Sequence, residues 1–470
     1  MRREKISFFT AVLPIIVLLL TGAFSVFYWK VGMIVPLLSG VVTTGIIGFV
    51  HNFKWEELQE GLKEGVANAL PAIFILLIVG SIIGTWILSG TIPAMIFYGL
   101  KFLNPSLFVP LAALITAIVS TTLGTSFTSI ATVGIALIAV GNAMGFATPL
   151  TAAAIISGAF FGDKLSPLSD TTNIAAAMAE CKLFDHVGHM LWDTIPAFVI
   201  SLIIYWGVGR SQMSGGFEGT EQINSLMQGL DSLFNITPLL FILPLITIFL
   251  AVRKTPAIPA LLSMSVLGGI FAMFFQGASL VQVLGSFTSG FKSSSEFEMI
   301  NSLLSKGGVT SMGGTIILLI TAAALGGIMQ KVGILDIILE KMMSWINSKR
   351  KLLVTSLATS FLIGLSTGAQ VLAIIIPAKM FANSFRKMGL HTKNLSRNVE
   401  AGGTVGITLV PWSVPAIFAA NMLGAEPAQF IPFLFFPMLV ILINAFYGLT
   451  EISIAEVAVE STDEKMRRDA

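Results

Sequence analysis

The sequence is poor in charged residues and in cysteine. Lys, Arg, Asp and Glu together make up 11% of its 470 residues, whereas a soluble globular domain carries roughly 25%. The net charge of +2 leaves no basic domain that could follow a nucleic-acid backbone. Cys181 is the only cysteine, so an intramolecular disulfide and a cysteine zinc site are both excluded.

What the chain has in abundance is apolar sequence. Hydrophobic residues make up 55% of it, and its mean hydropathy is +0.88. A helix needs about 20 apolar residues to cross the hydrocarbon core of a bilayer. We therefore expect an all-α polytopic membrane protein with about ten transmembrane helices. The uninterrupted spans are expected at 6–29, 31–50, 70–90, 190–209, 232–252, 256–276, 314–332 and 429–449.

Four further apolar stretches are irregular. Residues 147–181 and 397–424 are long enough to cross but are interrupted by Gly, Pro and polar residues, which predicts two broken helices. Residues 108–141 and 352–385 each consist of two apolar limbs around a polar tip. The limbs are only about 12–16 residues long, which predicts two re-entrant hairpins in place of full crossings.

Basic residues set the expected orientation. With the N-terminus in the cytoplasm and each hairpin returning to its own side, 20 of the 27 Lys and Arg residues lie inside and five lie outside. This is the bias that the positive-inside rule describes. We therefore expect a multi-pass protein of the cytoplasmic membrane with both termini in the cytoplasm.

The two halves of the chain match at an offset of 244 residues. Gly124 and Gly162 correspond to Gly368 and Gly406, and a Gly-x-x-Leu-x-Pro-x-Ser pattern recurs. Each half crosses the membrane five times, so the second repeat has the opposite orientation, an inverted topology that many secondary transporters use. The expected domains are a first repeat (1–209), an outside linker (210–231), a second repeat (232–450) and a cytoplasmic polar tail (451–470).

Polar groups reach membrane depth at four places. These are the hairpin tips 120–129 and 364–370 and the helix breaks 162–173 and 406–414. Unwound backbone within a bilayer is tolerated only where protein covers it or a cavity is lined by it, so the matched tips and breaks mark the site. Free carbonyls and hydroxyls are neutral oxygen ligands, which suit a hard cation such as Na⁺.

Charged side chains occur in the first break and have no counterpart in the second. A charged side chain at the bilayer centre costs at least about 2.5–3.5 kcal/mol. We hypothesise that Asp163 or Asp170 binds Na⁺ and H⁺ in turn, with Lys164 compensating their charge; the alternative is that Lys164 only neutralises a buried carboxylate. The other first-repeat candidates for the cation and proton site are Ser120, Thr121, Thr122, Thr125, Ser126, Thr171, Thr172 and Asn173. The second-repeat candidates are Ser366, Thr367, Glu400, Thr408 and Ser413.

Other ionisable side chains are expected nearer the surface. Two interpretations of Glu400 stay open, a proton site or an interfacial ion pair with Arg397. Asp193 is expected at a membrane end. His186 and His189 follow an aspartate in a short inside loop, where a solvated turn is favoured over a metal site.

The residues together predict a mechanism. Na⁺ and a proton compete for the same anionic oxygen in a dehydrated pocket. If only the occupied, charge-compensated site can cross, that competition and access from one side at a time give Na⁺/H⁺ exchange. We therefore expect a secondary transporter of small ions and not an enzyme, with no resident cofactor and no nucleic-acid partner.

The stretch GDKLSPLSDTTNIAA from Gly162, the STTLGTS tip from Ser120 and the repeat organisation resemble the NhaC-type Na⁺/H⁺ antiporters. The resemblance covers essentially the whole chain. It implies membership of the ion-transporter superfamily with paired hairpins, and a homodimer that works by elevator-like movement. The resemblance also implies that the family includes antiporters that exchange malate and protons for lactate and Na⁺.

Three alternatives stay open. The first is a Na⁺/H⁺-coupled antiporter of a small carboxylate, in which Lys164 and half-helix N-termini bind the anion; no arginine reaches the site to clamp a dicarboxylate. A more remote alternative is an intramembrane aspartyl protease, which also needs two membrane carboxylates. A channel is the third, although a continuous pore does not need charge on one repeat only.

Overall fold

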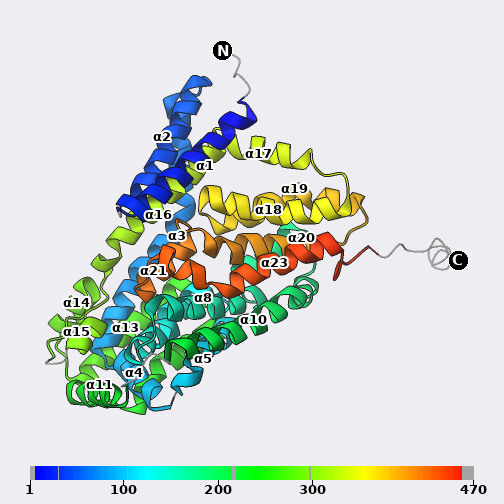
Figure 1. The fold of residues 1–470 in the computed structure, drawn as a ribbon. Helices are drawn as coiled ribbons and strands as arrows, with labels where there is room; N and C mark the ends of the chain where they lie inside the picture. The colour runs from blue at the N-terminus through cyan, green and yellow to red at the C-terminus, as the bar shows by residue number, and fades with distance from the viewer. Residues whose placement is uncertain are drawn as a thin grey trace.

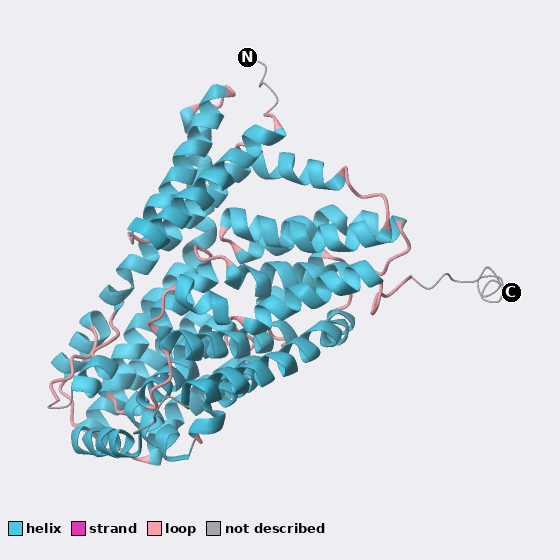
Figure 2. Cartoon of the chain, viewed as in Figure 1, coloured by secondary structure: helices cyan, strands magenta, loops and turns pink. Residues whose placement is uncertain are grey.

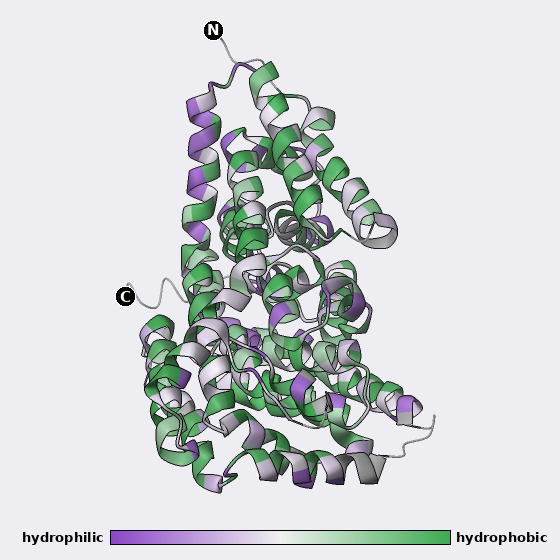
Figure 3. Ribbon diagram, turned by 90° about the vertical axis from the view of Figure 1, so that its left-hand side faces the viewer, coloured by the Kyte–Doolittle hydropathy of each residue, from purple (hydrophilic) through white to green (hydrophobic). Residues whose placement is uncertain are grey.

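The computed structural model describes residues 6–29, 31–102, 104–213, 219–253, 255–295 and 298–457. Within these ranges the chain consists of helices and short loops (Figure 2), apart from an isolated β-bridge between Leu390 and Glu456. Apolar residues predominate along most helices (Figure 3), and many large apolar side chains are exposed, among them Leu20, Phe49 and Phe274. An apolar outer surface is what a helical protein presents to lipid.

The helices of the first half lie as follows: α1 Phe8–Ala23, α2 Ile34–Val50, α3 Trp55–Leu88, α4 Thr91–Phe102, α5 Phe108–Leu123, α6 Ser126–Ser129, α7 Ile135–Ala143, α8 Thr148–Leu165, α9 Asp170–Met178 and α10 Leu183–Met213. Two π-helical segments, Phe24–Trp29 and Ile130–Gly134, continue α1 and join α6 to α7.

The helices of the second half are α11 Gly219–Leu233, α12 Ile242–Val252, α13 Ala257–Gln276, α14 Leu280–Ser289, α15 Glu298–Leu304, α16 Gly313–Lys331, α17 Ile334–Met343, α18 Lys349–Thr367, α19 Gln370–Lys387, α20 Lys393–Glu400, α21 Val414–Leu423, α22 Pro427–Phe430 and α23 Phe435–Thr450. A π-helical segment (Ala401–Val405) and a 3₁₀ turn (Gly406–Leu409) extend α20.

Six helices in the described part of the chain are long and apolar enough to cross a membrane, and the number is nine if each of three bent helix pairs forms one span. α1 and α2 are apolar but shorter, at 16 and 17 residues. The pair Lys393–Leu409 and Val414–Leu423 bends by 46° and is the second predicted broken helix. The all-α polytopic membrane fold with broken helices is therefore confirmed.

Three of the four hairpin limbs are longer than the 12–16 residues that the sequence predicts. Ser126–Ala143 has 18 residues, α18 has 19 and α19 has 18, whereas α5 has 16. The difference arises because polar tip residues stay helical: Thr121 and Thr367 each donate a side-chain hydrogen bond to the backbone carbonyl four residues back. Limb length alone therefore does not require a re-entrant hairpin.

Helix boundaries follow the 244-residue offset of the sequence repeat. α5 ends at Leu123 and α18 at Thr367, while α6 begins at Ser126 and α19 at Gln370. The helices after the breaks begin at equivalent positions too, since α9 and α21 start 244 residues apart. The two halves thus place a hairpin tip and a helix break at matching points.

Two connecting segments, the expected outside linker 210–231 and residues 277–313, are partly helical. The expected outside linker 210–231 overlaps the end of α10 and most of α11, and residues 214–218 lie outside the described ranges. Residues 277–313 contain α14 and α15, and the Gly308 N–H donates to the Gly80 carbonyl of α3 at 2.6 Å. This segment is therefore packed against α3 and not a free loop.

The chain after α23 folds back as a strap, residues 451–457, over the loop between α19 and α20. The His391 N–H donates to the Ala455 carbonyl and the Val457 N–H donates to the Gly389 carbonyl, both at 2.9 Å. Lys349 and Glu456 form an ion pair at its edge. The expected tail 451–470 is thus ordered as far as Val457, and 458–470 lie outside the described ranges.

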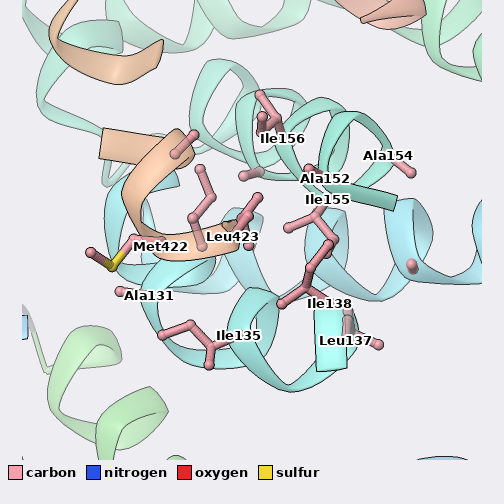
Figure 4. Close-up of a cluster of buried hydrophobic side chains, with 14 of the residues drawn as sticks. Ala131, Ile135, Leu137, Ile138, Ala152, Ala154, Ile155, Ile156, Met422 and Leu423 are labelled. Carbon is pink, nitrogen blue, oxygen red and sulfur yellow. The ribbon is translucent and has the colours of Figure 1, made fainter. Parts of the chain in front are cut away.

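Three sets of packed helices can be followed in Figure 1. α3 packs along α16, where the backbones approach closely at Gly65 and Gly327. α18 packs against α19, α20 and α23, and α8 packs against α5 and α10. An apolar core shared by α7, α8 and α21, with Ile138, Ile155 and Leu423 in it, joins the two repeats (Figure 4).

The crossing of α5 and α8 positions the first tip against the first break, and it depends on Gly158. A Cβ at Gly158 would overlap the Ala113 carbonyl of α5. We expect Gly158→Val to force these helices apart and to cost about 1–3 kcal/mol or more. The measurement is the thermal unfolding of the purified protein in detergent. Gly207→Val on α10 is the control, because nothing lies within 4 Å of its Cβ position.

Candidate functional site

Each hairpin tip turns on a glycine and contacts the break of its own repeat. Gly124 has φ +70° and Gly368 has φ +64°, a backbone conformation that side chains other than glycine rarely adopt. A Cβ at Gly124 would lie 2.7 Å from the Cβ of Leu168 in the first break. In the second repeat the Val414 N–H donates to the Gly368 carbonyl at 3.0 Å. The tips therefore hold the unwound segments in place.

The first break is the segment 166–169, between α8 and α9. Pro167 in this segment has no N–H to donate to a helix. Asn173 on α9 reaches back, and its Nδ2 donates to the carbonyls of Pro167 at 2.9 Å and Ser169 at 2.7 Å. The Pro167 carbonyl thus regains a hydrogen bond, and the Ser169 carbonyl, which also accepts from the Asn173 N–H at 3.1 Å, is bonded a second time.

Asp163 lies in the last turn of α8 and is 5% exposed. Its Oδ2 accepts hydrogen bonds from the Ser126 hydroxyl at 2.5 Å and from the Ser126 N–H at 3.2 Å. Its Oδ1 accepts from the Ser169 hydroxyl at 2.5 Å. The first hairpin and the first break therefore meet at this carboxylate, which has three donors.

Lys164 forms a buried ion pair with Asp193 of α10, and both side chains have 0% exposure. Asn444 of α23 donates from Nδ2 to the same carboxylate oxygen at 2.6 Å. The partner of Lys164 is thus Asp193 and not Asp163. Asp193, which was expected near a membrane end, lies more than two turns inside α10 and is fully buried between α8 and α23.

Glu400 is fully buried at the end of α20. Its Oε1 lies 3.0 Å from the hydroxyl oxygen of Thr171, which belongs to the other repeat. Arg397 does not pair with it: the guanidinium donates to the Ser453 carbonyl at 3.0 Å and lies 5.5 Å from the ring centroid of Tyr447. Of the two interpretations of Glu400, an ion pair with Arg397 at the interface is therefore wrong.

The other first-repeat candidates are Thr172, Asp170 and four hydroxyl residues near the tip. Thr172 is buried, and its hydroxyl donates to the carbonyls of Asp163 and Lys164, both at 3.2 Å. Asp170 begins α9 and is exposed, whereas Asp163 is buried. The spacing of seven positions therefore does not bring the two carboxylates to one buried point. Four other hydroxyl residues lie near the tip, where the side chains of the first three donate to backbone carbonyls: Ser120, Thr121, Thr122 and Thr125.

The second-repeat hydroxyls bond mainly within their own segments. Ser366 and Thr367 donate to the carbonyls four residues back, and Thr408 donates to the Val405 carbonyl at 2.7 Å. Ser413 caps α21 by accepting from the Ala416 N–H at 3.3 Å. The second break thus carries hydroxyls without a carboxylate of its own, as the sequence indicates.

The prediction that His186 and His189 lie in a solvated turn is wrong. His186 and His189 are 0% and 8% exposed, because α10 packs this end against α20. The His189 Nε2 lies 3.0 Å from the Asn394 Oδ1. Among the described residues, no group of three or more His, Cys, Asp and Glu side chains is placed to hold a metal ion.

Sequence reasoning missed three residues of this site. Ser169 had a signal, since it is the repeat partner of Ser413, which was a candidate. No pattern in the sequence indicated Asp193 or Asn444, because they come from helices outside the tips and breaks. Together with Lys164, Asp193 and Asn444 form a second buried polar cluster, separate from the hydrogen bonds of the Asp163 carboxylate.

A polytopic helical bundle with broken helices and buried carboxylates defines a membrane transporter and not an enzyme. The model of the Na⁺/H⁺ antiporter family matches residues 158–452, more than half of the chain and both breaks. The chain therefore belongs to this family, as the resemblance to the NhaC-type antiporters implies.

Three relatives show the range of the family. The Na⁺/H⁺ antiporter NhaC of Alkalihalophilus pseudofirmus is 35% identical over 92% of this chain and 93% of the relative. The malate-2H⁺/Na⁺-lactate antiporter of Bacillus subtilis is 34% identical over 86% of each chain. The arginine/ornithine antiporter ArcD of Halobacterium salinarum is 33% identical over 95% of this chain and 93% of the relative.

The buried Lys164–Asp193 pair makes a stability prediction. Removing one partner of a buried pair costs about 3–5 kcal/mol, because the other charge is left without compensation. We expect Lys164→Met and Asp193→Leu each to lower the unfolding temperature in detergent strongly, and the double variant to recover much of the loss. Lys331→Met is the control, since Lys331 pairs with Glu64 near the surface and exposed pairs contribute about 1 kcal/mol or less. Additive losses in the double variant would contradict the pairing.

Proposed function

We propose that this protein is a secondary active antiporter that exchanges Na⁺ for H⁺, with Asp163 as the carboxylate that binds either ion. The observation that carries the proposal is the position of Asp163, buried at a helix break and hydrogen-bonded to Ser126 and Ser169. A membrane-embedded carboxylate with hydroxyl neighbours offers the oxygen ligands that Na⁺ prefers. The family membership supports the same activity.

The chemistry follows from charge balance. An ionised Asp163 that faces no cation of its own needs a counter-charge to move within the membrane, because Lys164 is paired with Asp193. Na⁺ supplies this charge by binding the carboxylate with hydroxyl and carbonyl oxygens around it. A proton supplies it by converting the carboxylate to the neutral acid, and the two ions exclude each other.

The ions move when the site opens to one side at a time, which the repeated hairpins and breaks support. We propose that the protein lies in the cytoplasmic membrane with both termini in the cytoplasm, which the distribution of Lys and Arg supports. We further propose a homodimer, on the resemblance to the NhaC-type antiporters alone. The exchanged ions are its substrates, and we propose that it needs no resident cofactor.

The second candidate function is Na⁺/H⁺-coupled exchange of a small carboxylate. It is favoured by the relative that exchanges malate and lactate. Against it, Lys164 and Arg397 both have partners within the protein. A cavity of about 250 Å³ lies beside Pro411, but among the described residues that line it none is Lys or Arg to bind an anion. Na⁺ alone is therefore the better supported cargo.

A vesicle experiment separates these functions. In everted vesicles from cells without other Na⁺/H⁺ antiporters, we expect added NaCl to dissipate a preformed pH gradient and KCl to have less effect. Sodium malate or lactate should add nothing to the effect of NaCl. Dissipation that requires malate or lactate would establish the carboxylate antiporter in place of our proposal.

Asp163→Asn tests the residue. We expect this variant to reduce Na⁺-driven proton movement to background, because a neutral amide takes up no proton that could be exchanged for Na⁺. Asp185→Asn is the control, since Asp185 lies exposed at the start of α10 and outside the site. Normal exchange by Asp163→Asn would refute the assignment, and loss of exchange in Asp170→Asn alone would transfer the role to Asp170.

Ser126→Ala tests the hydroxyl ligand. Hydrogen bonds to charged groups contribute about 1.5–3 kcal/mol, and 1.4 kcal/mol corresponds to a tenfold change in affinity. We expect the Na⁺ concentration for half-maximal exchange to rise roughly tenfold or more on this reasoning. Ser129→Ala is the matched control, because the Ser129 hydroxyl donates only to the Thr125 carbonyl of its own helix. Equal responses of the two variants would remove Ser126 from the site.

A further inference from the structure

Two buried carboxylates, one from each repeat, are joined by a row of two hydroxyls. The Asp163 Oδ1 lies 2.5 Å from the Ser169 hydroxyl. The Ser169 and Thr171 hydroxyl oxygens are 3.0 Å apart, and the Thr171 hydroxyl lies 3.0 Å from the Glu400 Oε1. All four side chains are buried. The row is therefore closed off by protein at both ends.

The number of protons in this row is informative. Four oxygens in sequence make three hydrogen-bond contacts, and each contact needs one proton between its oxygens. The hydroxyls of Ser169 and Thr171 supply one proton each, so two contacts are satisfied. The third proton must come from a carboxyl group, and the geometry therefore fits a state in which Asp163 and Glu400 together hold one proton.

The surroundings of the two carboxyls indicate which one holds it. Asp163 accepts from the N–H and the hydroxyl of Ser126 as well as from Ser169, and three donors favour the ionised form. The second oxygen of Glu400, Oε2, is buried and makes no hydrogen bond among the described residues, and the buried hydroxyl of Thr404, which interacts with Glu400 from the π-helical segment, makes none either. A buried anionic oxygen without a donor is costly, so the arrangement fits a neutral Glu400.

The charged groups around Glu400 do not supply the missing compensation. Lys164 on α8 is paired with Asp193 of α10. Arg397, on the same helix as Glu400, is bound to Ser453 of the strap and stacks on Tyr447. Asp163, at the other end of the row, has the same sign as an ionised Glu400. A proton is thus the counter-charge that Glu400 has at hand.

We propose that Glu400 is a proton-loading site for Asp163 and that Thr171 and Ser169 relay the proton between them. When the site opens to one side, Glu400 takes a proton from water and passes it to Thr171; the Thr171 proton passes to Ser169, and the Ser169 proton passes to Asp163. Asp163 ends as a neutral acid, the Na⁺ that it held is released to water, and Glu400, ionised by the transfer, takes up the next proton from water. Each hydroxyl gains one proton and loses one, and each Na⁺ released is replaced by one proton on Asp163. This inference rests on the proposed Na⁺/H⁺ exchange.

The repeat shows why the two acids have different tasks. Asp163 corresponds to Ile407 in the second repeat, and Glu400 corresponds to Ile156 in the first, so neither acid has an acidic counterpart. The two acids also sit differently in their helices. Asp163 lies at the break beside the hairpin tip, while Glu400 lies before a π-helical segment, a distortion that is frequent at functional sites.

Transport assays in proteoliposomes test the relay with two variants. Glu400→Gln keeps a donor for Thr171 but has no transferable proton, and Thr171→Val removes the middle of the row without touching the donors of Asp163. We expect both to lower Na⁺/H⁺ exchange by about tenfold or more, the range for a positioned proton-transfer group, and to retain exchange of labelled Na⁺ for Na⁺. Thr116→Val is the matched control, because the buried Thr116 hydroxyl donates only within its own helix.

The outcomes are distinct. Unchanged Na⁺/H⁺ exchange in both variants would overturn the relay. Parallel loss of Na⁺/Na⁺ and Na⁺/H⁺ exchange would also overturn it, because the residues would then build the Na⁺ site itself. Rescue of Na⁺/H⁺ exchange by Thr171→Ser, which restores the hydroxyl, is expected.

Infrared spectroscopy tests the proton without any transport. We expect a protonated carboxyl band in the unmodified protein that disappears in Glu400→Gln and persists in Asp163→Asn. A band that disappears in Asp163→Asn and persists in Glu400→Gln would overturn the assignment. If the band behaves as expected but the unmodified protein moves no Na⁺, the relay stands and the proposed cargo is wrong.

Discussion

The absence of hydrogen-bonding solvent inside a bilayer is the constraint on which this structure depends. A helix that unwinds there exposes carbonyls and N–H groups that lipid cannot satisfy. Here the neighbouring tip and nearby side chains satisfy them: Asn173 bonds to two carbonyls of the first break, and the Gly368 carbonyl accepts from the helix after the second break. In the first repeat, the tip and the break also supply the donors to the Asp163 carboxylate, from Ser126 and Ser169.

The two repeats share a backbone arrangement but differ in the charged side chains that they carry. Both breaks have a proline, a serine at the N-cap position of the following helix and a tip glycine in equivalent places. The first break adds Asp163 and Lys164, whereas the second has Ile407 and Thr408 there. Because a buried charge in lipid must be compensated, each added charge brings a partner from another helix. Asp193 and Asn444 are such partners, and they tie α8 to α10 and α23.

Much of this organisation could be predicted from the sequence. Glycine and proline spacing located the tips and breaks, since these residues act through local backbone geometry, and the 244-residue offset is repeated in the helix boundaries. The environment of Asp193 could not be predicted, because burial depends on where α10 begins and on which helices cover it. Glu400 was ambiguous for a related reason: Arg397 is one turn away in the sequence, but its guanidinium points to Ser453, which no local pattern indicates.

The strap formed by residues 451–457 has a practical consequence. Arg397 is fully buried and owes its hydrogen bonds to the Ser453 carbonyl and hydroxyl, and Asn394 on the same helix bonds to the Ala455 backbone in both directions. The strap thus covers the buried guanidinium of Arg397, which lies one turn before Glu400 on α20. An affinity tag or fluorescent fusion should therefore be joined beyond Val457, since a shorter end would open that buried guanidinium to water.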